Sequence, residues 1–315
     1  MRAAVVRSFG SPPRCEEFPA PAPAGEHEIL VDVLAAGMHP RVRSAADGSH
    51  YTSSGELPLI PGIDAVGRTP DGGLLYFVAP DGVLGTMAEQ AVADRRRAVA
   101  LPDGTDPAAV AAAMNPGMSS WVALRRRARF DPGGSVLVLG ATGNAGRLAV
   151  QIAKRLGAAR VVAAGRDPER LEPLKDLGAD DVVRLDGGEA GRAAADVDVV
   201  LDYLWGPPAQ EAMPALLRAR TDRSKALAWV QIGSVAGPEI ALPSFVLRAA
   251  NLTVMGSGQG SVTTAGIVAE LPSLVEEIAS GALAVDAVPV PLDDVEQAWS
   301  APVRPGRRVV VTPAV

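Results

Sequence analysis

The first third of the chain consists of short apolar segments separated by clusters of proline and glycine. These segments are Ala3–Val6, Glu28–Ala35, Ala65–Arg68, Leu74–Val78 and Met87–Val92. Short apolar runs between turn-forming residues are typical of β-strands, whereas an amphipathic helix needs a longer periodic stretch. The pattern therefore predicts an all-β unit from Met1 to about Pro102.

After Asp103 the pattern changes to an alternation of helical and strand-like segments. The predicted helices are Pro107–Met114, Ser119–Arg127, Leu148–Leu156, Pro168–Leu177 and Ala209–Ala219. The predicted strands are Ser135–Leu139, Val161–Ala164, Asp181–Val183, Val197–Asp202, Ala226–Ile232 and Leu252–Met255. Such alternation predicts a parallel, doubly wound sheet with crossover helices, and sheets of this kind bind ligands beyond the carboxyl ends of their strands.

The chain returns to short strands from Ala287, and the last of them is Arg307–Thr312. We expect this tail to rejoin the first unit, because its pattern matches that unit. The predicted fold class is therefore α/β with two domains. A β domain at residues 1–115 is completed by residues 284–315, and a doubly wound sheet domain occupies residues 116–283.

Composition narrows the class of protein. The 315 residues carry 30 Lys and Arg against 36 Asp and Glu, and this net charge of −6 argues against a general binder of nucleic acid or membrane surfaces. No apolar run approaches the roughly 18 residues of a membrane-spanning helix, and no signal peptide is visible. The single cysteine, Cys15, forms no intramolecular disulfide. We expect a cytoplasmic protein.

A glycine-rich loop lies between the strand Val136–Leu139 and the helix that follows it. Glycines at such a place let the backbone turn and approach a pyrophosphate, whose charge meets the amides at the helix start. Because strand, loop and helix follow one another in the required order, the sequence predicts a nucleotide site. The candidate residues are Gly140, Thr142, Gly143, Asn144, Ala145 and Gly146.

The next strand, Val161–Ala164, ends in Gly165, Arg166 and Asp167. An acidic residue at this strand tip would accept hydrogen bonds from the ribose and repel a 2′-phosphate, whereas Arg166 attracts one. Gly165 and Arg166 therefore favour NADP(H) as the cofactor. Asp167 either caps the helix that starts at Pro168 or accepts hydrogen bonds from the ribose of the cofactor.

At residues 139–157 the loop and helix resemble those of medium-chain dehydrogenases/reductases. The segments Ala35–Pro40, Pro61–Gly67, Ala113–Trp121 and Pro289–Val311 are similar to the zinc-independent, quinone oxidoreductase-like (zeta-crystallin-like) branch of this superfamily. The resemblance implies a GroES-like β domain, a Rossmann domain that binds NADP(H), and a small-molecule substrate. It also implies a homodimer paired along the strand Leu252–Met255.

Three positions depart from the zinc-dependent relatives. His39 stands where those relatives have a cysteine, Ile63 where they have a histidine, and Asn115 where they have a second cysteine. A catalytic zinc site needs three protein ligands, so the sequence predicts no metal. Without a Lewis acid, a quinone or an enone is a more suitable hydride acceptor than a plain ketone, because its negative charge is delocalised. The resemblance to the branch points to the same substrates.

The resemblance also implies two candidates for the catalytic chemistry. His39 either donates a proton near the nicotinamide or is a structural histidine, and Tyr51 either contacts cofactor or substrate or is a half-buried loop tyrosine. The resemblance adds candidates for cofactor binding. Arg307 among them is equally well explained as a solvated strand end. The added candidates are Asn115, Ser119, Gly233, Ser234, Val235, Gly256, Ser257, Gly258 and Arg307.

The sequence leaves alternatives to an NADPH-dependent reductase of quinones or enones. No decisive acid or base residue is visible, so a cofactor-binding protein without turnover is a competing hypothesis. A specialised biosynthetic enone reductase or cyclase is another. A short-chain dehydrogenase is excluded, because none of Tyr51, Tyr76 and Tyr203 has a lysine four positions later.

Overall fold

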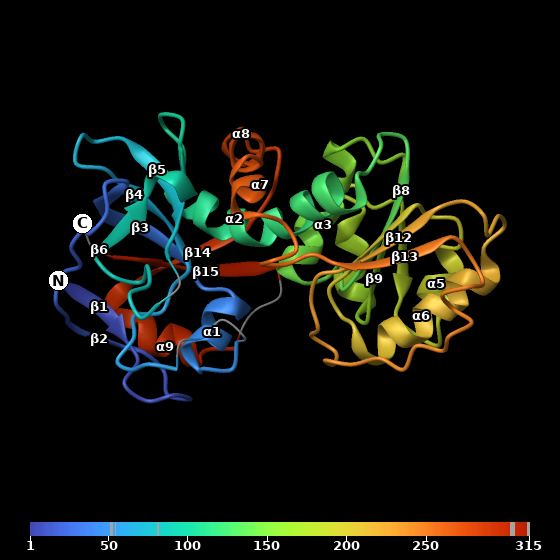
Figure 1. Cartoon of the computed structure of the whole chain (residues 1–315), viewed down its shortest axis with the longest axis horizontal. Coiled ribbons are helices and arrows are strands. Elements are labelled where there is room, and N and C mark those ends of the chain that lie inside the picture. The colour runs from blue at the N-terminus through green and yellow to red at the C-terminus, as the bar shows by residue number, and fades with distance from the viewer. Residues whose placement is uncertain (51–52, 54, 81, 303–305, 314–315) are drawn as a thin grey trace. The chain divides into compact units, whose positions relative to one another are not determined.

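The computed structural model describes residues 1–50, 53, 55–80, 82–302 and 306–313. The chain divides into two compact units, Met1–Asn115 with Val268–Val315, and Pro116–Ile267 (Figure 1). The first division falls within helix α2 (Pro107–Val122). The second precedes α8 (Leu271–Ala279), which therefore belongs to the first unit by its contacts. The predicted α/β class is confirmed, because one unit has a mostly antiparallel sheet and the other a parallel sheet.

The first unit is built on a seven-stranded sheet in the order β14-β15-β3-β4-β5-β7, with β6 also paired to β3. The tail strand β15 pairs antiparallel with β3, and β14 pairs parallel with β15. A separate two-stranded sheet joins β1 and β2. The strands are β1 (Arg2–Val5), β2 (Arg14–Glu17), β3 (Glu28–Gly37), β4 (Asp64–Arg68), β5 (Leu74–Val78), β6 (Gln90–Asp94), β7 (Ala98–Ala100), β14 (Asp286–Pro291) and β15 (Arg307–Thr312).

Alternation of side chains along β3 explains how this sheet buries its core. Val31 and Val33 are buried, while Asp32 between them is exposed. Phe77 and Met87 are fully buried in the same cluster. The helices of the unit are α1 (Pro40–Ala46), α8, α9 (Val295–Ser300) and the 3-10 turns η1 (Arg95–Arg97) and η4 (Leu292–Asp294).

The second unit is a six-stranded parallel sheet in the order β10-β9-β8-β11-β12-β13. The strand order reverses between β9 and β11 on either side of β8, which makes the carboxyl end of β8 the switch point where such sheets bind ligands. The strands are β8 (Ser135–Leu139), β9 (Arg160–Gly165), β10 (Asp181–Arg184), β11 (Val199–Asp202), β12 (Leu227–Gln231) and β13 (Leu252–Gly256).

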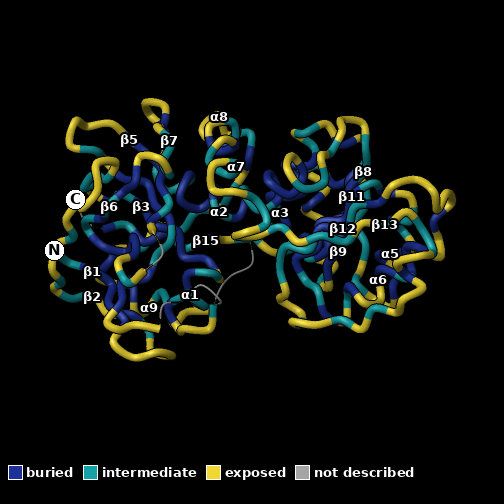
Figure 2. Tube along the Cα trace, viewed as in Figure 1, coloured by how far each residue is buried: buried dark blue, intermediate teal, exposed yellow. Residues whose placement is uncertain are grey.

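Helices pack on this sheet through one apolar face. In α3 (Asn144–Arg155) the residues Leu148, Ile152 and Ala153 are buried against the sheet, as expected for an amphipathic crossover helix. Figure 2 shows the central strands β8, β11 and β12 buried. The other segments are α4 (Pro168–Leu171), η3 (Glu172–Leu174), α5 (Glu189–Ala193), α6 (Gly206–Ala219), α7 (Thr264–Val268) and η2, a π-helix (Ala123–Ala128).

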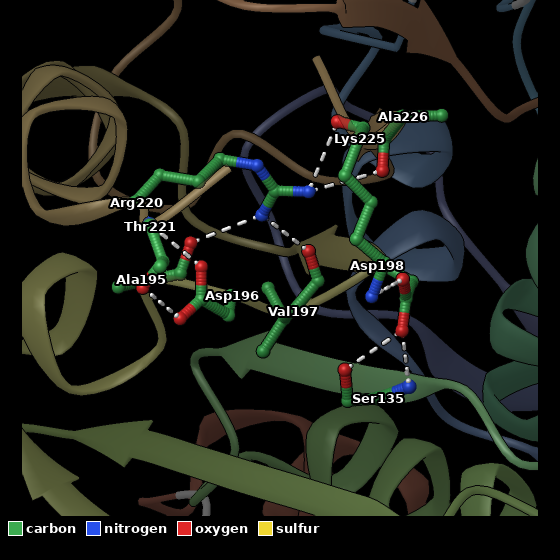
Figure 3. A network of polar contacts seen from close by, with 9 residues as sticks. All are labelled: Ser135, Ala195, Asp196, Val197, Asp198, Arg220, Thr221, Lys225 and Ala226. Atoms are coloured by element: carbon green, nitrogen blue, oxygen red, sulfur yellow. Dashed lines mark hydrogen bonds and ion pairs between the residues drawn. The ribbon is translucent and has the colours of Figure 1, made fainter. Parts of the chain in front are cut away.

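A polar network closes the amino-terminal end of the sheet (Figure 3). Arg220, which is only 4% exposed, donates to the carbonyl oxygens of residues 195, 197, 225 and 226 at 2.8–3.1 Å. Asp198 accepts from the backbone amide and the hydroxyl of Ser135, both at 2.8 Å, and pairs with Lys225. The network joins the start of β8, the approach to β11 and the turn before β12, so it stabilises the sheet at this end.

Candidate functional site

The loop after β8 is held against the end of β9. The amides of Gly140 and Ala141 both donate to the carbonyl oxygen of Ala164, at 3.0 and 2.9 Å. Gly140 has φ +87°, a left-handed conformation that favours glycine. The amide of Gly143 then donates to the carbonyl oxygen of Gly140 at 3.1 Å, which closes the turn into α3.

Two glycines are required by close approach of the backbone. A Cβ atom at Gly146 would lie 2.3 Å from the carbonyl oxygen of Gly140, and one at Gly165 would lie 2.7 Å from Cγ2 of Thr142. Gly146 thus lets α3 start directly beside the loop, and Gly165 lets β9 end directly beside it. These contacts are those of a dinucleotide-binding turn, in which glycine allows helix and strand to pack closely.

The start of α3 is suited to an anion. Its N-cap is Gly143, which is exposed and supplies no side-chain cap. The first-turn amides of a helix have no intrahelical partner and carry partial positive charge. An uncapped first turn beside a glycine loop at the switch point therefore fits a phosphate group.

Arg166 and Asp167, at the end of β9, have different environments. Asp167 caps α4, accepting from the amide of Glu169 at 3.0 Å, and its carboxylate also pairs with Arg170 at 3.0 Å. The side chain of Arg166 is exposed and has no hydrogen-bond or ion-pair partner in the described part of the chain. The capping role considered for Asp167 from the sequence is therefore present, and the guanidinium of Arg166 is available to a ligand.

Asp202, at the end of β11, was not among the predicted site residues. Its buried carboxylate accepts from the amides of Leu204 and Trp205, both at 2.9 Å, and from Nε1 of Trp229 at 3.0 Å. Burial raises the pKa of Asp202 although these donors oppose the shift. Trp205 has φ +52°, a backbone conformation that costs a residue other than glycine about 1–3 kcal/mol. The two hydrogen bonds from backbone amides to Asp202 hold the loop in this conformation.

Tyr203 connects this loop to α2. Its hydroxyl lies 2.9 Å from the hydroxyl of Ser119, which donates to the carbonyl oxygen of Pro116 at 2.6 Å. Burial raises the pKa of Tyr203 to about 12, against the opposing effect of the bond with Ser119. The phenol is therefore neutral near pH 7. The predicted residue Ser119 thus meets an aromatic residue to which the sequence assigned no role.

The loops after β12 and β13 present few amides. The amide of Gly233 donates to the carbonyl oxygen of Asp202 at 3.1 Å, and that of Val235 to the carbonyl oxygen of Tyr203 at 3.4 Å. After β13, the amide of Ser257 donates to the carbonyl oxygen of Gln231 at 2.8 Å. Ser234 and Gly258 are exposed, as is Gly256.

In the first unit, His39 belongs to a buried polar cluster. It is 3% exposed, and its Nε2 lies 2.9 Å from the carboxylate of Asp64, which also accepts from the hydroxyl of Tyr76 at 3.0 Å. Burial raises the pKa of Tyr76 well above its ordinary value. The guanidinium of Arg308 donates to the carbonyl oxygen of Met38 at 3.2 Å, and burial lowers its pKa to about 10 while Asp64 opposes the shift.

The remaining predicted residues differ in their surroundings. Asn115 is half-buried within α2. Arg307 is exposed and its Nε donates to the carboxylate of Asp286 at 2.8 Å, so its head group is engaged at the strand end. Tyr51 lies outside the described residues. The cluster around His39, with Asp64 and Arg308, was missed because only the pairing of β3, β4 and β15 brings these residues together.

Two properties of the described residues bear on metal and membrane binding. They contain no group of three His, Cys, Asp or Glu side chains placed to hold a metal ion. None of their helices is long and apolar enough to cross a membrane.

Comparison with known proteins places this geometry in a family. A probable NADPH-dependent quinone reductase from Emericella nidulans is 31% identical over 99% of this chain and 100% of its own length. The quinone oxidoreductase from Thermus thermophilus, solved also in complex with NADPH, has a TM-score of 0.84 and 28% identity over 99% of this chain and 100% of that chain. The chain belongs to the medium-chain dehydrogenase/reductase superfamily, in its quinone oxidoreductase-like branch.

Other matches within the superfamily are partial. The family model of zinc-binding dehydrogenases matches residues 145–280, a range that contains neither His39 nor Asn115. A 2-methylene-furan-3-one reductase from Solanum lycopersicum is 32% identical over 49% of this chain and 44% of its own length. Membership of the superfamily thus rests on the full-length relatives.

Proposed function

We propose that this protein is an NADPH-dependent reductase of quinones or α,β-unsaturated carbonyl compounds, acting by hydride transfer. One observation carries the proposal. Asp167 is engaged as a helix cap and by Arg170, while Arg166 is exposed without a partner in the described chain. A strand tip that offers a guanidinium and no available carboxylate favours a 2′-phosphate. The names of the relatives, a quinone reductase and a furanone reductase, support the substrate class.

The carboxyl ends of the sheet strands fit a dinucleotide. Gly146 and Gly165 leave no room for a Cβ atom, and they thereby let α3 and β9 pack directly against the loop after β8. Arg166 would bind the 2′-phosphate, and Ser119 and Asn115 would lie near the nicotinamide. Arg307, engaged with Asp286, would have to exchange that partner to reach a phosphate. The residues proposed to hold the pyrophosphate and the nicotinamide half are Gly140, Thr142, Gly143, Asn144, Ala145, Gly146, Gly233, Ser234, Val235, Gly256, Ser257 and Gly258.

When bound, the reduced nicotinamide supplies a hydride. The chain must then hold the negative charge that develops on the substrate oxygen and provide one proton. In a quinone or an enone this charge is delocalised, so hydrogen bonds suffice to stabilise it. His39, Ile63 and Asn115 at the three metal positions of the zinc-dependent relatives do not form a zinc ligand set. We therefore include independence of zinc in the proposal.

His39 and Tyr51 remain the proposed proton donors. Because Nε2 of His39 faces the carboxylate of Asp64, Nδ1 is the nitrogen that can exchange a proton with a partner outside this pair. When Nε2 donates its proton to Asp64, Nδ1 of the neutral ring is an acceptor, so Nδ1 donates only when both ring nitrogens carry a proton. The nearby guanidinium of Arg308 offsets the charge of Asp64. The role of His39 is thus tied to the charge of this cluster.

The proposal extends to assembly and location. β13 is an edge strand of its sheet with partly exposed residues, and we propose that two copies of the chain pair along it as a homodimer. Light scattering at micromolar concentration tests this, and a monomer contradicts it. The single cysteine supports the cytoplasm as the location.

The proposed function is tested by following NADPH oxidation by absorbance with quinones, enones, aldehydes and saturated ketones, before and after treatment with a zinc chelator. We expect turnover of quinones or enones only, unchanged by the chelator, and a preference for NADPH over NADH. Binding of NADPH without turnover would instead favour a non-catalytic protein or a specialised enone reductase or cyclase. Turnover of saturated ketones that the chelator abolishes would contradict independence of zinc.

A further inference from the structure

We infer that Arg127 is a positioning residue that fixes the loop after β13 for productive binding of the nicotinamide. The inference rests on the proposed function, because it assumes that residues 256–258 meet this part of the cofactor. From the sequence alone, Arg127 was predicted only as the last residue of the helix Ser119–Arg127. Arg127 and residues 256–261 all lie within the second unit.

The backbone geometry places Arg127 at an unusual segment. α2 passes directly into the π-helix η2, whose C-cap Arg129 has φ +49°, a left-handed conformation in a residue other than glycine. π-helical turns are rare and occur often at functional sites. Two residues earlier, the exposed Arg125 has its Cζ atom 5.4 Å from the ring centroid of Trp121. Arg127 is half-buried.

Arg127 bridges the two ends of the loop. Its Nε donates to the carbonyl oxygen of Gly256 at 2.8 Å, and its Nη1 to that of Ser261 at 3.4 Å. Inside the loop, the amide of Gly258 donates to the hydroxyl of Ser261 at 2.8 Å. The guanidinium therefore ties together residues 256 and 261, which the chain otherwise connects through a single turn.

Apart from its contacts with Arg127, the loop is held mainly by short-range bonds, such as that from the amide of Ser261 to the carbonyl oxygen of Gly258 at 3.0 Å. A Cβ atom placed at Gly256, Gly258 or Gly260 would find no atom within 4 Å, so these glycines have open space on their side-chain side. Glycine-rich backbone loses much conformational entropy when it is ordered. The guanidinium of Arg127 binds both ends of the loop and so orders it in the free protein. Less conformational entropy is then lost when a ligand binds, which is the effect called preorganisation.

This arrangement predicts a specific kinetic effect. A protein whose loop after β13 is loosely held would still bind the phosphates of the cofactor, because these are assigned to the start of α3 and the end of β9. The nicotinamide would be less well placed for hydride transfer, since small displacements of reacting groups reduce the rate strongly. Loss of Arg127 should therefore lower kcat more than it weakens NADPH binding.

The test compares Arg127→Ala, Arg127→Lys and the control Arg126→Ala, a neighbour in the same π-helix. For each we would measure the Kd of NADPH by fluorescence, kcat with the best quinone or enone, the primary isotope effect with NADPH deuterated at the transferred position, and the thermal midpoint. We expect Arg127→Ala to lower kcat about tenfold or more and to raise the isotope effect, with Kd raised about threefold. Lysine should restore only part of kcat, because an ammonium cannot reproduce the fork.

The outcomes separate this inference from the proposed function. If Arg127→Ala matches Arg126→Ala in kcat and isotope effect, or if its only change is a lower thermal midpoint, the positioning role is wrong. If the wild-type protein binds NADPH but turns over no substrate, the proposed function fails. In that case the loop can still be examined by limited proteolysis of the NADPH complex, where Arg127→Ala should be cleaved faster between residues 256 and 261 and equal cleavage would overturn the inference.

Discussion

Asp198 immediately precedes β11 and Asp202 ends it, so the same strand carries one carboxylate to each end of the parallel sheet. At the amino end, Asp198 is partly exposed and pairs with Lys225, and its pKa lies below the usual range because hydrogen bonds outweigh the effect of burial. At the carboxyl end, Asp202 is fully buried without a cationic partner in the described chain, and burial raises its pKa.

The two ends of this sheet differ in what their polar groups do: those at the amino end stabilise the fold, and those at the carboxyl end form the candidate ligand site. At the amino end, the guanidinium of Arg220 donates to four backbone carbonyl oxygens of the same unit. The carboxyl end keeps an uncapped helix start, an unpaired Arg166 within the described chain and the strained Trp205. Unpaired and strained groups of this kind are expected at ligand-binding sites. Variants at the two ends should therefore change different measurements.

The largest effect is expected at the carboxyl end, for Gly146→Ala. Its Cβ would lie 2.3 Å from the carbonyl oxygen of Gly140, so α3 must move away from the loop. We expect NADPH binding to weaken about a hundredfold or more, because the amides at the helix start lose their position. Isothermal titration of the folded variant measures this. Gly143→Ala adds its methyl group where the nearest atom lies 3.5 Å away, and should cost much less. Equal losses for the two variants would contradict the steric argument.

At the amino end, Arg220→Met should lower stability and leave cofactor binding unchanged. The variant removes the donor for four carbonyl oxygens while keeping most of the length of the side chain. We expect the free energy of unfolding to fall by about 3 kcal/mol, as for the loss of a buried hydrogen-bond network. Urea unfolding measures it, with the exposed Arg218→Met as control. A changed Kd of NADPH in the folded variant would mean that the two ends of the sheet are coupled.

A smaller effect is expected for Arg166→Ala, which should weaken NADPH binding about tenfold and leave NADH binding within about twofold, because only NADPH carries the 2′-phosphate. Arg170→Ala is the matched control, since this neighbouring arginine pairs with Asp167 and is not assigned to the cofactor. Fluorescence titration with both cofactors measures the ratio. An equal loss for NADPH and NADH would show that Arg166 does not bind the 2′-phosphate.

The elements of the second unit were predictable because their strands are buried runs of β-branched residues, which need no knowledge of distant partners. The predicted helix Pro168–Leu177 was partly wrong, since α4 ends at Leu171 and the 3-10 turn that contains Pro173 follows. The strand β2 was missed, because Arg14–Glu17 has no apolar alternation and depends on pairing with β1.

The candidate site also contains parts that the local sequence predicts and contacts that it does not. The glycine loop between β8 and α3 follows from a local order of strand, glycines and helix, so the sequence alone predicted its place in the fold. The bond from Arg127 joins residues 129 positions apart, and the bond from Trp229 to Asp202 joins residues 27 positions apart. Contacts of this kind depend on strand order and register, which local patterns do not specify.

The two carboxylates give the last and smallest prediction, a difference in pH dependence. The folded pKa of Asp198 is depressed, so its stabilisation is present above the unfolded pKa of about 3.9 and is lost as pH falls through the folded value. Asp198→Asn should therefore cost about 1 kcal/mol near pH 7 and progressively less in acid. The folded pKa of Asp202 is raised, so its ionisation lowers stability as pH rises from about 3.9 through the folded value.

Asp202→Asn removes that ionisation, and the stability of this variant relative to wild type should improve with rising pH, opposite in sign to Asp198→Asn. Urea unfolding of both variants between pH 3 and pH 8 measures the two slopes. Slopes of the same sign would mean that burial does not dominate at the carboxyl end. Opposite slopes would show that one strand begins beside a carboxylate stabilised by charge and ends in one held by burial and backbone amides, at the expense of stability near neutral pH.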